Sequence, residues 1–142
     1  MNISRELLDD LIAHVREDPE NEVCGVVAVE APDDTDAGGH PRALRVYRAR
    51  NMHASPLRFE IEPEELRELW NACEEIGELG AIYHSHVRSE PYPSQTDVNF
   101  ASNWPGVEWI IVSLAGGEEP DVRSYLIEGS DIKEVALAET AM

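Results

Sequence analysis

Apolar residues recur at helical spacing in two parts of the chain. Near the start they predict a helix that ends before Asp18, built on Ile3, Leu7, Leu8, Leu11, Ile12 and Val15. A second helix is expected to begin at Pro63, because proline is favoured in the first helical turn. Its apolar face carries Leu66, Leu69, Trp70, Cys73 and Ile76. Both patterns indicate amphipathic helices that pack on one side against a core.

Shorter runs between and after these helices predict strands. Residues 22–29 open with a carboxylate, Glu22, and continue as an apolar strand. Residues 42–50 alternate charged with apolar or small side chains, which indicates a half-exposed strand, and the polar stretch 31–41 is expected to join the two as a hairpin connection. Further strands are predicted at 58–61, at 80–83 with the histidines that follow, and at 107–114, 121–127 and 132–137.

The order of these elements defines the expected fold class. Helix, three strands, helix, strand, helix and three strands suit an α/β fold in which a mixed sheet is flanked by helices. The length of 142 residues suits a single domain spanning 1–142 that is large enough to bury a core. We find no internal repeat and no sign of a second domain.

The charge balance limits the classes of partner that the protein is expected to bind. Asp and Glu number 29 against 11 Lys and Arg, so the net charge is −18, which argues against nucleic acid and anionic membranes. Lys133 is the only lysine, a composition that fits either a saline cytoplasm or a GC-rich genome. No signal peptide and no membrane-spanning run is recognised, so a reducing cytoplasm is expected. Cys73 and Cys24 are both interpreted as packing residues, with redox sensitivity of Cys24 left open.

The candidate chemistry lies in a short stretch, His84-x-His86-x7-Ser94-x2-Asp97. On a strand, side chains two apart point to the same side, so both histidines can approach one ion. Two imidazoles and one carboxylate leave a fourth tetrahedral position open on zinc, which is typical of a catalytic site. The alternative is that the histidines only pack and that Ser94 and Asp97 form the capping box of a helix over 98–101. These roles compete for Asp97, since a carboxylate on zinc is not free to cap its own helix.

The same spacing resembles the signature of the JAMM (MPN+) zinc metalloproteases, which cleave amide or isopeptide bonds next to the C-terminal tail of ubiquitin-like proteins. The resemblance implies the MPN fold, a cytidine-deaminase-like curved mixed sheet flanked by helices, along the whole chain. It implies one Zn²⁺ per chain, held by His84, His86 and Asp97. Glu22, in the context Glu22-x-Cys24-Gly25, matches the family's catalytic base, and Ser94 is expected to stabilise the oxyanion.

Within this family the chain is most similar to the prokaryotic hydrolases that release cysteine from a sulfur-carrier protein. The similarity rests on Asn51 to Phe59 (NMHASPLRF), Tyr83 to His86, Pro93 to Asp97, and Arg123 to Tyr125, together with Glu22 to Gly25. It implies a substrate in which the Gly-Gly tail of a ubiquitin-like carrier is amide-linked to cysteine, with the tail bound as an added strand. The alternatives are an isopeptidase that removes a small ubiquitin-like modifier from lysine, a peptidase acting on short peptides and, ranked low, a non-catalytic MPN scaffold.

Three further residues are candidates for substrate binding. Arg88, in the loop after the histidines, could hold the carboxylate of the cysteine as a bidentate donor, or it could simply be solvated. Asn51 and Ser55 resemble family positions near the active-site wall, and a role in a turn is equally open.

Overall fold

The computed structural model describes residues 1–31, 41–116 and 119–140. The elements follow the chain in this order: β1 (Asn2–Ser4), α1 (Arg5–Arg16), β2 (Cys24–Val29), β3 (Ala43–Ala49), α2 (Pro63–Ile76), β4 (Glu78–His86), α3 (Gln95–Ala101), β5 (Glu108–Ser113), β6 (Asp121–Glu128), β7 (Asp131–Val135) and β8 (Ala138–Thr140). The two long helices match the predicted ones closely.

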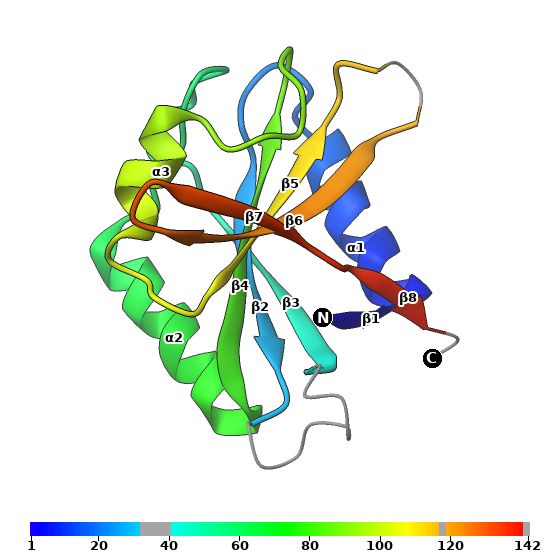
Figure 1. The fold of residues 1–142 in the computed structure, drawn as a ribbon, viewed down its shortest axis with the longest axis vertical. Helices are drawn as coiled ribbons and strands as arrows, with labels where there is room; N and C mark the ends of the chain where they lie inside the picture. Colours follow the sequence, from blue (N-terminus) through cyan, green and yellow to red (C-terminus); the bar gives the residue numbers. More distant parts are fainter. Residues whose placement is uncertain (32–40, 117–118, 141–142) are drawn as a thin grey trace.

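A six-stranded sheet with the order β3-β2-β4-β5-β6-β7 forms the centre of the molecule. Only β4 and β5 run parallel, and the other neighbours pair antiparallel, so the sheet is mixed as predicted. Figure 1 shows the sheet curving between α1 on one side and α2 and α3 on the other. The strands β2 and β4 at its centre are therefore covered on both faces, which explains their nearly continuous apolar runs.

Alternate residues of β2 supply two separate cores. Cys24 and Val26 pack with residues of α2 and α3, whereas Val27 and Val29 pack on the other face with residues of α1. Cys73 of α2 lies in the same core as Cys24, and both thiols are free and buried. This agrees with the interpretation of both cysteines as packing residues. No helix in the described part of the chain is long and apolar enough to cross a membrane.

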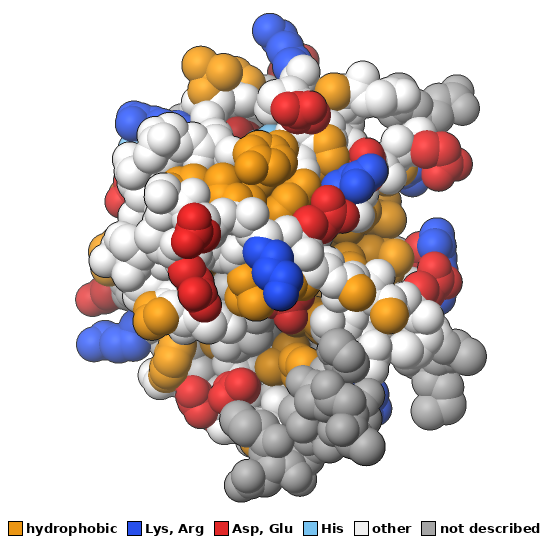
Figure 2. All heavy atoms as spheres, in the orientation of Figure 1, with side chains coloured by type: hydrophobic (Ala, Val, Ile, Leu, Met, Phe, Trp, Pro, Cys, Tyr) orange, Lys and Arg blue, Asp and Glu red, His pale blue; other side chains and the backbone are white. Residues whose placement is uncertain are grey.

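Arginines on the surface lie among acids. On the face shown in Figure 2, arginine and lysine side chains are scattered singly between acidic and hydrophobic ones. Arg123, for example, pairs with both Asp121 and Glu134. Ion pairs of this kind set cations beside acids, and the net charge of −18 is the excess of acids that remains.

Two parts of the fold differ from the prediction. Residues 58–61 are not a strand, and backbone groups of Arg58 and Glu60 are hydrogen-bonded to Asn51 and Met52 of the same loop instead. Residues 2–4 form β1, which pairs parallel with β8. The predicted strand 132–137 ends at Val135 in β7 of the main sheet, and β8 begins only at Ala138, in this small second sheet. The predicted connection at 31–41 joins two strands that pair antiparallel, as expected, but residues 32–40 lie outside the described part.

Candidate metal centre and active site

The last residues of β4 bring the two histidines to the same face of the sheet. His84 and His86 are separated by one residue of a strand that is hydrogen-bonded to β2 on one side and to β5 on the other. His84 is fully buried and His86 is 4% exposed. The intervening Ser85 points to the opposite face, where its Oγ accepts the N–H of Val23 at 2.8 Å. The strand therefore fixes both imidazoles and also ties down the residue that follows Glu22.

Asp97 comes from the first turn of α3. Ser94 is the N-cap of this helix, and its Oγ accepts the N–H of Asp97 at 3.2 Å. In return, Asp97 Oδ2 accepts the N–H of Ser94 at 2.9 Å, which completes a capping box. The same Oδ2 lies 3.2 Å from His84 Nε2 and 3.3 Å from His86 Nε2. One oxygen of Asp97 therefore faces both the helix cap and the histidines, so capping does not turn the carboxylate away from the candidate site.

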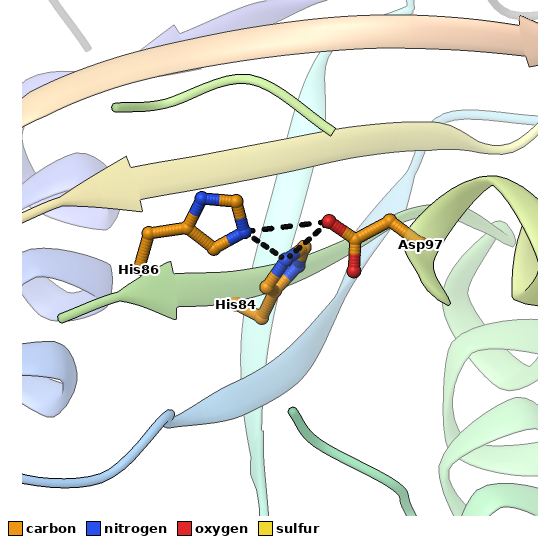
Figure 3. A group of neighbouring side chains, drawn as sticks. All are labelled: His84, His86 and Asp97. Atoms are coloured by element: carbon orange, nitrogen blue, oxygen red, sulfur yellow. Dashed lines mark hydrogen bonds and ion pairs between the residues drawn. The ribbon is translucent and has the colours of Figure 1, made fainter. Parts of the chain in front are cut away.

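The three side chains have the spacing that a tetrahedral zinc ion needs. His84 Nε2 and His86 Nε2 are 3.1 Å apart, so the triangle that they form with Asp97 Oδ2 has edges of 3.1–3.3 Å (Figure 3). Ligand atoms at about 2.0–2.1 Å from a tetrahedral zinc are about 3.3 Å from each other. Among the described residues, no other group of three or more histidines, cysteines and acids is close enough to hold an ion. The chemistry and the spacing of this group fit zinc.

The two histidines present the same nitrogen to the centre of this triangle. His86 Nδ1 is 2.9 Å from the carbonyl oxygen of Glu90, which can only accept a hydrogen bond, so Nδ1 carries the proton. The lone pair of His86 is then on Nε2, which faces Asp97 and His84. The carbonyl of Glu90 is an outer contact that the sequence did not reveal, since a main-chain atom leaves no pattern in the side chains.

Glu22 lies two residues before the start of β2 and is 6% exposed, so the prediction that it opens the strand is wrong by two positions. Its backbone is held from both sides by the segment that follows β3. The N–H of Glu22 donates to the carbonyl of Ser55 at 2.8 Å, and its carbonyl accepts from Asn51 Nδ2 at 3.0 Å. At Glu22, hydrogen bonds to this loop thus take the place of the backbone hydrogen bonds that would join it to a neighbouring strand.

Asn51 organises that loop as well as Glu22. Its second amide hydrogen bond goes to the carbonyl of Arg58 at 3.0 Å, and its Oδ1 accepts the N–H groups of His53 and Glu60, each at 3.1 Å. The Oγ of Ser55 accepts the N–H of Leu57 at 3.1 Å. Both residues lie beside Glu22, and their polar groups contact the chain itself. Arg88, by contrast, is exposed and forms no ion pair among the described residues.

Burial dominates the electrostatics of the site. It raises the pKa of Glu22 from 4.5 to about 8, with His86 lowering this pKa and Asp97 raising it. Burial by itself would raise the pKa of Asp97. Its pKa nevertheless lies far below the usual range, because the charge of His84 and the hydrogen bonds from His84, His86 and Ser94 outweigh the effect of burial. For His86, burial lowers the pKa, while hydrogen bonds to Asp97 and Glu90 raise it overall. Asp97 is therefore ionised, and Glu22 is poised to exchange a proton near neutral pH.

One residue in contact with the candidate ligands was given no role by the sequence. Phe59 stacks on the ring of His84, with the ring centroids 4.5 Å apart. The sequence pointed to Phe59 only as the last residue of the stretch 51–59, which resembles the family but indicates no role for this residue.

The chain is similar to known proteins over most of its length. A model of the prokaryotic homologues of the JAB domain matches residues 4–128. The CysO-cysteine peptidase of Mycobacterium tuberculosis is 33% identical over 133 residues, covering 93% of this chain and 86% of that protein. The desampylase of Haloferax volcanii is 34% identical over 146 residues, covering 97% of this chain and 95% of that protein.

Among solved structures, a JAB1/MPN domain protein from Archaeoglobus fulgidus superimposes with a TM-score of 0.60 at 19% identity, and the match covers 98% of each chain. This likeness shows the fold, and it confirms the MPN architecture that the sequence predicted. With the family match over residues 4–128, it establishes that the chain belongs to the prokaryotic homologues of the JAB domain, the JAMM/MPN family.

Proposed function

We propose that this protein is a zinc-dependent hydrolase that cleaves the amide bond between the C-terminal glycine of a ubiquitin-like sulfur-carrier protein and cysteine, and so releases cysteine. The observation that carries the proposal is the triangle formed by His84, His86 and Asp97 at tetrahedral spacing. A buried carboxyl group, Glu22, lies close enough for the charges of His86 and Asp97 to shift its pKa. Three protein ligands with a carboxyl group nearby are typical of catalytic zinc sites.

The choice of substrate is supported by the relatives. The CysO-cysteine peptidase is similar over 93% of this chain, which favours cysteine as the leaving group. The desampylase matches at the same level of identity, so removal of a small ubiquitin-like modifier from lysine is the second candidate. A non-catalytic scaffold ranks last, because both histidines, Asp97, Glu22 and Ser94 are all present.

In this proposal His84, His86 and Asp97 hold one zinc ion, which supplies a Lewis acid and makes water a stronger acid at neutral pH. Glu22 takes a proton from the attacking water and returns it to the departing nitrogen. Ser94 donates its hydroxyl hydrogen to the oxygen of the attacked carbonyl. That hydrogen is available, because the Ser94 oxygen only accepts in the capping box. No covalent intermediate with the chain is required.

The substrate is proposed to contact the protein at two places, through its Gly-Gly tail and through the cysteine, and the protein is proposed to act in the cytoplasm. The Gly-Gly tail would bind as an extended strand beside the site. Arg88 is exposed in the loop after β4 and would hold the carboxylate of the cysteine. A cytoplasmic location fits the two free thiols, Cys24 and Cys73.

Mass spectrometry of two substrates tests the proposal. A carrier–cysteine amide and a lysine isopeptide of the same carrier are each incubated with the zinc-loaded protein, with Glu22→Ala and the exposed Glu20→Ala as the inactive and matched control variants. The expected result is rapid release of cysteine by the wild type and by Glu20→Ala, and none by Glu22→Ala. Cleavage of the isopeptide alone would move the function to deconjugation. Zinc binding without cleavage of either substrate would favour the scaffold.

A further inference from the structure

The two histidines are held in place by different kinds of contact. His86 is oriented by a hydrogen bond between its Nδ1 and the Glu90 carbonyl. His84 has no such bond. Its Nδ1 is buried and has no hydrogen-bond partner among the described residues. Metal-binding histidines almost always donate their second ring N–H to an acceptor that fixes the orientation of the ring. Something else must therefore set the position of His84.

The ring of His84 is covered instead by Phe59. The two ring planes are inclined by 25°, with the centroids 4.5 Å apart, which is a stacked arrangement. Phe59 is 6% exposed, and its own place is fixed by Phe100 of α3, at a centroid distance of 5.9 Å. Phe100 in turn makes an edge contact with Trp109 of β5. His84 therefore rests against a chain of aromatic rings anchored in the core.

We propose that Phe59 is a positioning residue that orients His84 and thereby increases the affinity of the site for zinc. This inference rests on the proposed zinc site. Stacking limits rotation of the imidazole, so less freedom is lost when the ion binds. In addition, an imidazole that donates its lone pair to a divalent cation carries part of the positive charge, and the face of an aromatic ring attracts positive charge. The stack is thus stronger when zinc is bound than when it is absent.

Competition with a chromophoric zinc chelator measures the effect without any substrate. Phe59→Leu removes the ring and is expected to weaken zinc binding by about 10- to 100-fold, the range that follows loss of an outer contact to a metal ligand. Phe59→Tyr keeps the ring and should bind zinc as the wild type does. Tyr47→Leu is the matched control, because it removes an aromatic ring that packs against the same core from β3, outside the stack formed by His84, Phe59 and Phe100. It should leave zinc affinity unchanged.

Each outcome decides the question. Wild-type zinc affinity in Phe59→Leu, or an equal loss in Tyr47→Leu, would overturn the proposal, and so would failure of Phe59→Tyr to retain affinity. If Phe59→Leu does not fold, Phe59→Met replaces it, since methionine fills irregular space without a ring. A wild-type protein that binds no zinc would instead refute the proposed function. The two failures are therefore distinguishable.

Discussion

Replacing Glu22 with glutamine should make the metal-free protein more stable at neutral pH while it abolishes hydrolysis. Burial raises the pKa of this carboxyl group from 4.5 to about 8, against a lowering by His86 and with a further raising by Asp97. Because the pKa is higher in the folded state than in the unfolded state, the folded protein binds the proton more tightly. Stability is therefore lost as the pH rises from about 4.5 towards 8, and a side chain that cannot ionise avoids this loss.

The size of the effect follows from the same two values. At pH 7 the unfolded state has lost the proton and the folded state has kept it, so the interval from 4.5 to 7 costs about 3 kcal/mol at about 1.36 kcal/mol per pH unit. At pH 5 the same reasoning gives only about 1 kcal/mol. Glu22→Gln should therefore gain up to about 3 kcal/mol at pH 7 and about 1 kcal/mol at pH 5.

Urea unfolding of the metal-free protein at both pH values measures the difference. Glu20→Gln is the control, because Glu20 is exposed two residues away and its replacement should change the free energy of unfolding by less than about 0.5 kcal/mol. A gain for Glu22→Gln that is equal at pH 5 and pH 7, or absent at both, would refute the assignment of a raised pKa to buried Glu22. The assay needs no substrate, so it tests the electrostatics independently of the reaction.

Three other substitutions separate the roles of the surrounding residues. Ser94→Ala should lower kcat by about 100- to 1000-fold through loss of an oxyanion donor. It should also lower the free energy of unfolding by about 1 kcal/mol through loss of the N-cap. The variant is expected to retain zinc, and a zinc-free variant would contradict the role of Ser94 as an oxyanion donor. Asn51→Ala should lower kcat without changing zinc affinity in a chelator titration, because it frees the carbonyl of Glu22 rather than a ligand; an unchanged kcat would argue against this positioning role. Gly25→Ala should lower the free energy of unfolding in urea by about 1–3 kcal/mol, since a Cβ there would overlap the ring of Tyr83; wild-type stability would show that the ring moves aside easily.

The sequence predicted the elements whose patterns are local. The helix at Pro63–Ile76 has a proline start and an apolar face, and the structure places it at those residues. Elements that depend on distant partners were missed. Asn2–Ser4 is a strand only because Ala138–Thr140 lies beside it. Residues 58–61 have a strand-like composition, but Arg58 and Glu60 are hydrogen-bonded to Asn51 of the same loop, which no local pattern indicates.

The same distinction applies to the site. The spacing of His84 and His86 on a strand is sufficient to predict that both face one point, since the period of a strand is fixed. The contacts that hold Glu22 could not be read in this way. They connect its main-chain N–H and carbonyl to Ser55 and Asn51, and no rule of spacing relates a backbone group to a residue thirty positions away. The resemblance indicated their neighbourhood, and only the structure gives their partners.

The oxygen that Asp97 shares between the helix cap and the two histidines also constrains how this chain can evolve. A single codon change that removes the carboxylate would take away one of the proposed zinc ligands and weaken the first turn of α3 together. A descendant that gave up catalysis but kept the fold would preserve this turn best with glutamine at position 97, since that side chain carries no carboxylate and can still reach back to the N-cap N–H. Inactive descendants should then carry a recognisable mark at this position, in addition to the loss of the histidines.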